Sequence, residues 1–272
     1  MSIITLTTDF GLKDYYVGAI KGFIFQHFPE VRVVDLSHLI DPFNHTEASY
    51  LLKASVRNFP ENTIHIVGVD CEKNIKNVPV AMRWKKQFFI GTDNGILSLL
   101  SNEETPEQVV TFHYQNQSKS TMEEFVLAAG KIIQNPDLNR IGTTHELKKV
   151  TSIQPIVAKD GNSITGSVVY IDGMGNLVFN ISKKFFEEVR KGRKFEIMFK
   201  PKILKTIYEN YGEVLVGING ELKDVEGSKV AIFNELDYLE IGTFGANPNR
   251  TGTAKTLYGF DYFDSLTIQF IP

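Results

Sequence analysis

The sequence predicts two domains: an N-terminal α/β domain with a mostly parallel sheet flanked by helices, and a smaller, mostly antiparallel, barrel-like β domain. In the first part of the chain, short β-branched runs alternate with helical stretches, as in sheets built from βαβ units. In the second part, short strand-like runs follow one another between glycine turns, which is typical of antiparallel sheets. Of the 272 residues, we assign 1–150 to the α/β domain and 160–272 to the β domain, joined by a loop-like stretch around 148–162.

The α/β domain opens with a strand at residues 3–6, because Ile3-Ile4-Thr5-Leu6 is apolar and rich in β-branched side chains. A helix at 17–25 follows, and Pro42 restricts the backbone before the next helix. The same signals place strands at residues 31–36, 63–69, 78–84, 87–91 and 109–113, and helices at 46–59, 95–100 and 121–134. Strands that alternate with helices predict a sheet covered on both faces.

The β domain is predicted from brief apolar runs with turn residues between them. One helix, at residues 183–191, interrupts these runs. The expected strands lie at residues 163–171, 177–180, 195–199, 214–218, 229–233, 238–241 and 266–271.

Composition narrows the classes of function. A formal net charge of −3 gives no electrostatic reason to expect nucleic acid as a partner. The single cysteine, Cys71, excludes an intramolecular disulfide framework and favours a reducing compartment. No apolar run approaches the roughly 18 residues of a membrane span, and the first residues lack the pattern of a signal peptide. We therefore expect a cytoplasmic protein that contacts no membrane.

Acidic residues follow several predicted strands. Asp9 and Asp14 lie between the first strand and the first helix, Asp70 follows the third strand, and Asp93 follows a later one; Asp172 lies in a glycine-rich turn of the β domain. Ligands of open α/β sheets bind beyond the carboxyl ends of the strands. Carboxylates there can accept hydrogen bonds from the vicinal hydroxyls of a ribose, and they favour a positively charged ligand. The alternative is local: Asp9 and Asp14 cap the helix, and Asp172 closes its turn.

Other reactive residue types carry weaker signals. The six histidines show no metal-binding pair, and no glycine-rich phosphate loop follows a strand, so we expect neither a metal nor a nucleotide cofactor. Cys71 beside Asp70 is more typical of a small buried residue than of a nucleophile. His65 lies inside a strand and is expected to be structural. His38 and His45 flank a loop, where they either contact a ligand or serve as helix caps or surface residues.

Several motifs together resemble a known family. They span nearly the whole chain in order: Thr8-Asp9-Phe10-Gly11, Asp14-Tyr15-Tyr16-Val17-Gly18, Lys21-Gly22, Val34-Asp35-Leu36-Ser37-His38, Gly91-Thr92-Asp93-Asn94-Gly95, Tyr170-Ile171-Asp172, Gly175-Asn176 and Asn180. This set resembles the S-adenosylmethionine (SAM) hydroxide adenosyltransferases, a family that includes fluorinases and chlorinases. The resemblance implies a homotrimer that binds SAM or adenosine between the α/β domain of one subunit and the β domain of the next. It implies no cofactor besides this substrate.

The resemblance also implies roles for individual residues. Asp9 would bind the ribose hydroxyls, Asp14 would lie near the methionine part, and Phe43 would pack against the nucleoside. From the neighbouring subunit, Asp172 would face the methionine ammonium, with Asn176 near the adenine and ribose. The remaining substrate-binding residues implied are Met174, in the same turn, and Asn234 and Glu235, in the segment whose backbone reads adenine.

The implied reaction is attack on the ribose C5′ atom by water, which yields adenosine and methionine, or by a halide. The family surrounds the nucleophile with an aspartate, an arginine and a histidine. Here Asp70 matches the aspartate, Asn77 stands at the arginine position and Ser120 at the histidine position.

We therefore assign Asp70, Asn77 and Ser120 as catalytic, with Lys73, Lys76 and His113 as residues that could substitute for the missing groups. Two alternatives stay open: a protein that binds SAM or adenosine without turnover, and an enzyme that uses a different nucleophile.

Overall fold

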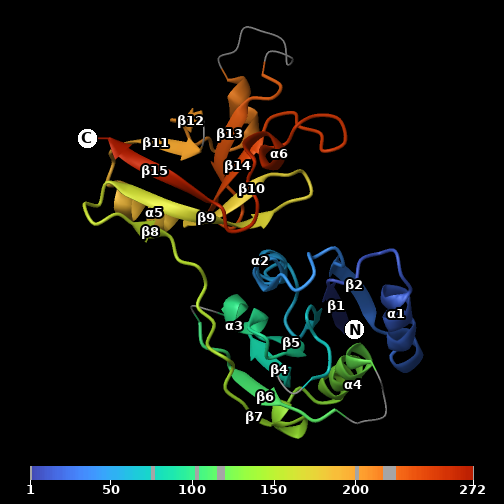
Figure 1. Ribbon diagram of the computed structural model, residues 1–272. Helices are drawn as coiled ribbons and strands as arrows, with labels where there is room; N and C mark the ends of the chain where they lie inside the picture. The colour runs from blue at the N-terminus through green and yellow to red at the C-terminus, as the bar shows by residue number, and fades with distance from the viewer. Residues whose placement is uncertain are drawn as a thin grey trace. The chain divides into compact units, whose positions relative to one another are not determined.

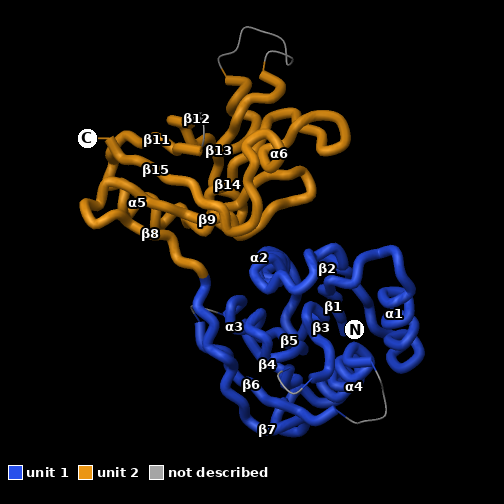
Figure 2. The backbone as a smooth tube through the Cα atoms, viewed as in Figure 1, with its two compact units in different colours: residues 1–152 blue, residues 153–272 orange. Residues whose placement is uncertain are grey.

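The chain divides into two compact units, residues 1–152 and 153–272 (Figure 2). The computed structural model describes residues 2–74, 77–101, 104–114, 120–199, 202–216 and 225–271.

Unit 1 is built on a seven-stranded sheet with the strand order β2-β1-β3-β5-β4-β6-β7 (Figure 1). Its strands are β1 (Ile3–Thr8), β2 (Arg32–Ser37), β3 (Ile64–Gly68), β4 (Pro79–Trp84), β5 (Gln87–Thr92), β6 (Gln108–Thr111) and β7 (Thr143–Thr144). Strands β2, β1, β3 and β5 pair in parallel, whereas β4, β6 and β7 pair antiparallel. The carboxyl ends of β1 and β3 therefore lie next to each other at one edge of the sheet.

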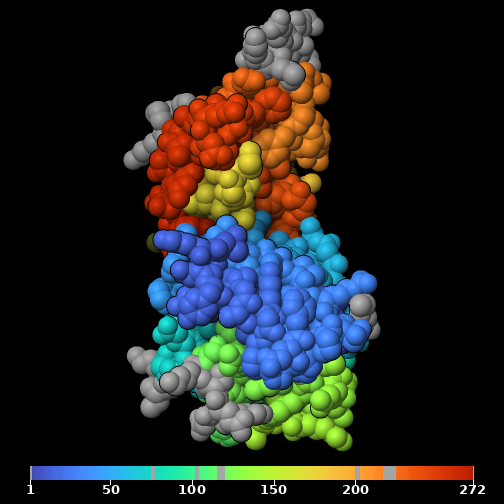
Figure 3. All heavy atoms as spheres, turned by 90° about the vertical axis from the view of Figure 1, so that its right-hand side faces the viewer, coloured from blue at the N-terminus to red at the C-terminus, as the bar shows by residue number. Residues whose placement is uncertain are grey.

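Helices cover both faces of this sheet, as the alternation of elements predicts. Side chains of α1 (Tyr16–His27) and α4 (Thr121–Gln134) pack with Ile64 and Ile66 of β3. Those of α2 (His45–Val56) and α3 (Ile96–Ser101) pack with Val67 on the opposite face. The space-filling view shows residues from the start of the chain, in blue, beside residues from the end of unit 1, in green, on one face (Figure 3).

Side-chain caps fix where two of these helices begin. The Asn44 side chain accepts a hydrogen bond from the Glu47 backbone N–H at 3.1 Å, which starts α2 at His45. Ser120 does the same for α4 through the Glu123 N–H at 3.4 Å.

Unit 2 contains an eight-stranded antiparallel sheet that closes most of the way into a barrel (Figure 1). The order is β12-β11-β15-β9-β10-β14-β13, with β8 paired to β9. Its elements are β8 (Ile156–Val157), β9 (Ser163–Ile171), β10 (Leu177–Ser182), α5 (Lys183–Arg190), β11 (Lys194–Phe199), β12 (Lys202–Leu204), β13 (Lys229–Phe233), β14 (Tyr238–Thr243), α6 (Ala254–Tyr258) and β15 (Ser265–Ile271). Side chains that alternate along β9 and β15 fill the core together with Phe186 of α5.

The fold class predicted from the sequence is confirmed, and one predicted element is wrong. Residues 214–218 were expected to form a strand, but the described part belongs to a 3₁₀ turn, η2 (Tyr211–Leu215). The Asn210 side chain accepts a hydrogen bond from the Gly212 N–H at 2.9 Å, which starts this turn. Residues 217 and 218 lie outside the described residues. No helix in the described parts of the chain has the length and apolar character that a membrane span requires.

Candidate functional site

The Asp9 carboxylate joins two loops beside the carboxyl end of β1. Its Oδ2 atom accepts hydrogen bonds from the Phe43 N–H at 3.2 Å and from the Asp70 N–H at 3.3 Å. Phe43 and Asp70 both have left-handed backbones, with φ of 64° and 46°. Such a conformation costs an ordinary side chain roughly 1–2 kcal/mol, so the shared acceptor helps to hold both loops in place.

Asp70 pairs with a histidine from another element. Its Oδ2 atom lies 2.9 Å from His45 Nε2, and both side chains are 30% exposed. His45 is the first residue of α2, so the Asn44 cap fixes its place. Sequence reasoning named His45 only as one of two loop histidines; nothing in the local sequence signals that it meets Asp70, which lies on β3's carboxyl end.

Asn77 organises the loop after Asp70. Its buried side-chain amide donates hydrogen bonds to the carbonyl oxygens of Asp70 and Glu72, both at 3.1 Å. Asn94 supports the same turn by donating to the Asp70 carbonyl at 3.2 Å. The position assigned to an arginine therefore holds a neutral residue whose N–H groups are directed to the backbone.

The other residues expected around the nucleophile lie as follows. Ser120 is the N-cap of α4. The Lys73 Nζ atom lies 3.6 Å from Glu124 Oε1 and 4.5 Å from the centre of the Tyr114 ring, so its charge faces a buried carboxylate. His113 is exposed, and Lys76 lies outside the described residues. Within the described ranges, Asp70 forms hydrogen bonds with Asp9, His45, Asn77, Thr92 and Asn94.

Two further predicted residues of unit 1 are exposed. Phe43 presents 69% of its surface to solvent, which is unusual for a large aromatic side chain. Asp14 is exposed in the loop that precedes α1.

His38 is buried, and its Nδ1 atom lies 2.7 Å from Thr8 Oγ1, so the expectation of a surface role for it is wrong. His65 is structural, as expected: its ring nitrogens bond Thr5 and Gln87.

In unit 2, the predicted turn is closed by its own aspartate. Asp172 Oδ1 accepts hydrogen bonds from the N–H groups of Met174 and Asn176, both at 2.8 Å. Asp172 Oδ2 accepts one from the Asn176 side chain at 2.9 Å. This is the local turn role considered above, and it leaves the Met174 side chain about half exposed.

A partly buried tyrosine–glutamate pair, which sequence reasoning missed, bonds to one of the predicted residues of unit 2, Asn234. Tyr211 donates a hydrogen bond to Glu240 Oε1 at 2.8 Å, and the Asn234 amide donates to Glu240 Oε2 at 3.2 Å. Burial raises the pKa of Glu240, and the nearby charge of Asp172 raises it further, although the two hydrogen bonds oppose the shift. Burial and the Glu240 charge raise the pKa of Tyr211.

The same group packs against Gly242 of β14. A Cβ atom at this position would come within 2.1 Å of the Tyr211 hydroxyl and 2.5 Å of Asn176 Oδ1. Glycine is therefore required for these polar groups to approach the strand. Glu235 is exposed nearby, and its charge contributes to the raised pKa of Glu240.

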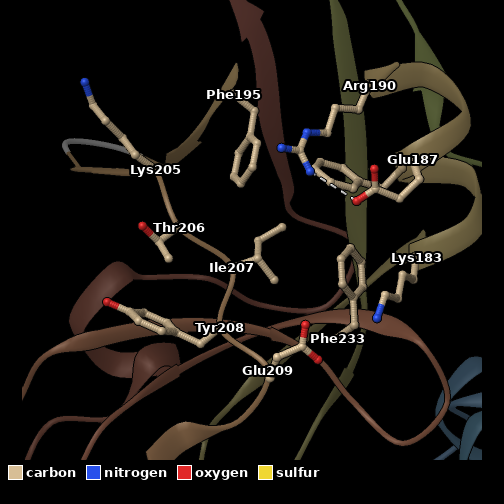
Figure 4. A pocket seen from close by; sticks show the side chains of 11 residues that line it. Lys183, Glu187, Arg190, Phe195, Lys205, Thr206, Ile207, Tyr208, Glu209 and Phe233 are labelled. Atoms are coloured by element: carbon tan, nitrogen blue, oxygen red, sulfur yellow. Dashed lines mark hydrogen bonds and ion pairs between the residues drawn. The ribbon is translucent and has the colours of Figure 1, made fainter. Parts of the chain in front are cut away.

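A separate pocket of about 280 Å³ lies in unit 2 between α5, residues 205–209 and the end of β13 (Figure 4). Its walls combine aromatic and charged side chains: the rings of Phe186 and Phe195 meet edge to face at 5.3 Å, and Phe233 also lines the pocket. Arg190 lies over Phe195 and pairs with Glu187 at 3.2 Å. None of the residues predicted for SAM lines this pocket, so it is an opening at the edge of the unit 2 core.

Among the described residues, no three His, Cys, Asp or Glu side chains are grouped to hold a metal ion.

Comparison with models of known protein families identifies the family of this chain. Residues 4–142 match the model of the SAM hydroxide adenosyltransferase N-terminal domain, and residues 166–267 match that of the C-terminal domain. The chain belongs to the SAM hydroxide adenosyltransferase family. The resemblance seen in the motifs is thereby confirmed, and the chain is a member of an enzyme family.

Relatives in this family extend over the whole chain. A protein of Methanocaldococcus jannaschii named (R)-S-adenosyl-L-methionine hydrolase is 24% identical over 98% of this chain and 96% of its own length. A protein of Thermus thermophilus with the same name is 32% identical, over 36% of this chain and 38% of its own length.

Solved structures share the fold. A conserved protein of Thermotoga maritima superimposes with a TM-score of 0.80 at 22% identity, covering 98% of this chain and 99% of its own. A conserved protein of Thermus thermophilus gives a TM-score of 0.70 at 20% identity, covering all of both chains. The two-unit architecture of this adenosyltransferase family member is therefore shared by other proteins at low sequence identity.

Proposed function

We propose that this chain hydrolyses SAM at the ribose C5′ atom and releases adenosine and methionine, with no cofactor. The names of its relatives support this substrate and reaction class. The observation that carries the proposal is the hydrogen-bonded pair of Asp9 and Asp70 at the neighbouring carboxyl ends of β1 and β3. This edge of an α/β sheet is where ligands bind.

Each polar group has a chemical reason to face such a substrate. Because Asp9 uses Oδ2 for the two backbone bonds, its Oδ1 atom is the one to accept the ribose hydroxyls. The exposed ring of Phe43 offers a face to the nucleoside. Carboxylates around a sulfonium cation stabilise its positive charge, and we assign Asp14, which is exposed in the loop before α1, to the methionine part.

We extend the proposal to the assembly. In a homotrimer, unit 2 of a neighbouring subunit would supply Asp172, Met174, Asn176, Asn234 and Glu235 to the same substrate. Within unit 2, the bond to Glu240 holds Asn234, and the Asp172 carboxylate holds Met174 and Asn176. The buried, unpaired thiol of Cys71 supports a reducing compartment such as the cytoplasm.

The reaction is a displacement at carbon. The water oxygen bonds to C5′ on the side opposite sulfur, the C5′–S bond breaks, and its electron pair stays on sulfur to give the neutral thioether of methionine. Asp70 takes the proton that the water loses. The leaving group is intrinsically good, so the protein contributes mainly by positioning the water and excluding other solvent.

A second candidate function is binding of SAM or adenosine without turnover. It is favoured by one observation: the arginine position is Asn77, which directs its amide to the loop backbone. A halide as nucleophile is a third candidate that rests on Ser120, and the capping role of that hydroxyl argues against it.

Incubation of the purified protein with SAM, followed by chromatography and mass measurement, tests the proposal. We expect adenosine and methionine in equal amounts, and a loss of roughly 10²-fold or more in the Asp70→Asn variant. Asparagine has almost the same volume as aspartate, so binding of SAM measured by calorimetry serves as the control for folding. Binding without product supports the second candidate, a halogenated nucleoside supports the third, and absence of both binding and product refutes the proposal.

A further inference from the structure

We propose that His45 is a positioning residue for Asp70 and takes over part of the task of the charged groups that this chain lacks. The inference rests on the proposed function, because it concerns the same reaction. It starts from one contact, the 2.9 Å approach of His45 Nε2 to Asp70 Oδ2.

The contact is built into the fold by a common anchor. Asp9 Oδ2 accepts the N–H of Asp70 itself and the N–H of Phe43, two residues before His45. One oxygen atom therefore anchors Asp70 directly and also anchors the loop that leads to His45. The Asn44 cap adds a second constraint, because it sets the residue at which α2 begins.

The contact also leaves one carboxylate oxygen available. Within the described ranges, Asp70 Oδ1 accepts no hydrogen bond from the protein, whereas Oδ2 is held by His45. A carboxylate fixed through one oxygen cannot rotate freely, so its other oxygen is presented in one direction. At 30% exposure, this carboxylate is sheltered but can still be reached by water.

The neighbouring charges leave His45 as the partner suited to this task. Asn77 is neutral and is directed to carbonyl oxygens. The Lys73 ammonium faces Glu124. Among the described residues, His45 is the side chain that lies within hydrogen-bond distance of the Asp70 carboxylate.

The proton balance of the step follows from this arrangement. As the water oxygen bonds to C5′ and the C5′–S bond breaks, the water proton passes to Asp70 Oδ1. The imidazole keeps its Nε2 proton throughout and acts by holding Oδ2. His45 therefore acts through Asp70.

Two variants at this position separate positioning from a general structural role. In His45→Ala, the bond to Asp70 is lost; we expect kcat to fall roughly tenfold or more with KM within about twofold of the wild type. In His45→Gln, the side-chain N–H reaches the same oxygen, and we expect most of the lost kcat to return. His27→Ala, which removes an exposed histidine at the end of α1, is the matched control and keeps the wild-type kcat.

The double variant His45→Ala/Asp70→Asn completes the test. If His45 acts through Asp70, the double variant is no slower than Asp70→Asn alone, because the effects of residues that act as a unit are not additive. A wild-type kcat in His45→Ala, equal losses in the Ala and Gln variants, or additive losses in the double variant would overturn the inference while adenosine formation by the wild type upholds the function. Absence of adenosine from the wild type refutes the function and this role together.

Discussion

The buried carboxylate of Asp93 lies 2.8 Å from His145 Nε2 and also accepts a hydrogen bond from the Lys148 N–H at 3.0 Å. Asp93 was one of the acids that the sequence places after a strand, where a ligand is expected. In the structure, its oxygen atoms instead bond to His145 and Lys148, in the segment that leads out of unit 1. The Ser98 hydroxyl adds a hydrogen bond to the Lys148 carbonyl.

Replacing Asp93 by alanine should loosen this connecting segment. The N–H groups of His145 and Lys148 lose their charged acceptor, and a hydrogen bond to a charged group contributes about 1.5–3 kcal/mol to the free energy of unfolding. We expect faster tryptic cleavage after Lys148 and Lys149 than in the wild type, measured by mass spectrometry of timed digests. Glu146→Ala, which removes a surface ion pair in the same segment, is the control and should cleave at the wild-type rate. Equal rates for Asp93→Ala and wild type would contradict the role assigned to Asp93.

His65 should make the stability of the protein depend on pH. Burial lowers its pKa from 6.5 to about 4 in the folded protein, although the hydrogen bond to Gln87 opposes the shift. Below pH 6.5 the unfolded chain therefore binds a proton that the folded protein does not, and stability falls as the pH falls from 6.5 towards 4. At roughly 1.4 kcal/mol per pKa unit, the loss is about 3 kcal/mol.

Urea unfolding of the wild type and of His65→Gln at pH 7 and pH 5 measures this effect. The variant is less stable at pH 7, because the fit to Thr5 and Gln87 is lost, but its stability should change less with pH. A parallel pH dependence in the two proteins would show that His65 is not responsible.

Cys71 should be unreactive in the folded protein. Burial raises the pKa of its thiol to about 12, and the nearby charge of Asp9 acts in the same direction. At pH 8 only about one thiol in 10⁴ is then ionised, and the thiolate is the reactive form. Mass spectrometry after iodoacetamide treatment should find the folded protein unmodified and the urea-unfolded protein fully modified. Rapid labelling without urea would mean that the thiol is accessible.

Glu240 should make the protein less stable as the pH rises. Its pKa is raised mainly because it is buried, so the folded protein holds its proton more tightly than the unfolded chain. The stabilising contribution is fully present below the unfolded-state pKa of about 4.5 and is lost as the pH rises through the folded value. The melting temperature of Glu240→Gln, relative to the wild type, is therefore expected to increase between pH 5 and pH 8. Glu188→Gln, at an exposed position of α5, is the control. A Glu240→Gln difference that changes with pH no more than the Glu188→Gln difference would contradict the role assigned to Glu240.

The elements that could be predicted from the sequence are those with a strong local pattern. The β-branched run at residues 63–69 predicts β3 (Ile64–Gly68) within a residue at each end. The two- and three-residue strands β7, β8 and β12 are too short for any periodicity to appear, and they form because a neighbouring strand offers a free edge.

Some residues of the candidate site could likewise be predicted from local patterns, and others could not. Asp9 and Asp70 could be predicted because both follow strands, and parallel strands end at one edge of the sheet. His45 and Asp70 are 25 positions apart, and Tyr211 and Glu240 are 29 positions apart, and each pair joins different elements. Such contacts depend on packing in three dimensions, which no local pattern contains.

The shared oxygen of Asp9 has a consequence for anyone who probes this protein by mutagenesis. A change at that position disturbs the backbone of two loops at the same time as it alters whatever the other oxygen touches, so a lost activity would not identify the cause. Altering the small molecule avoids this ambiguity: an analogue of SAM without one ribose hydroxyl leaves the protein intact and tests the contact proposed for Oδ1.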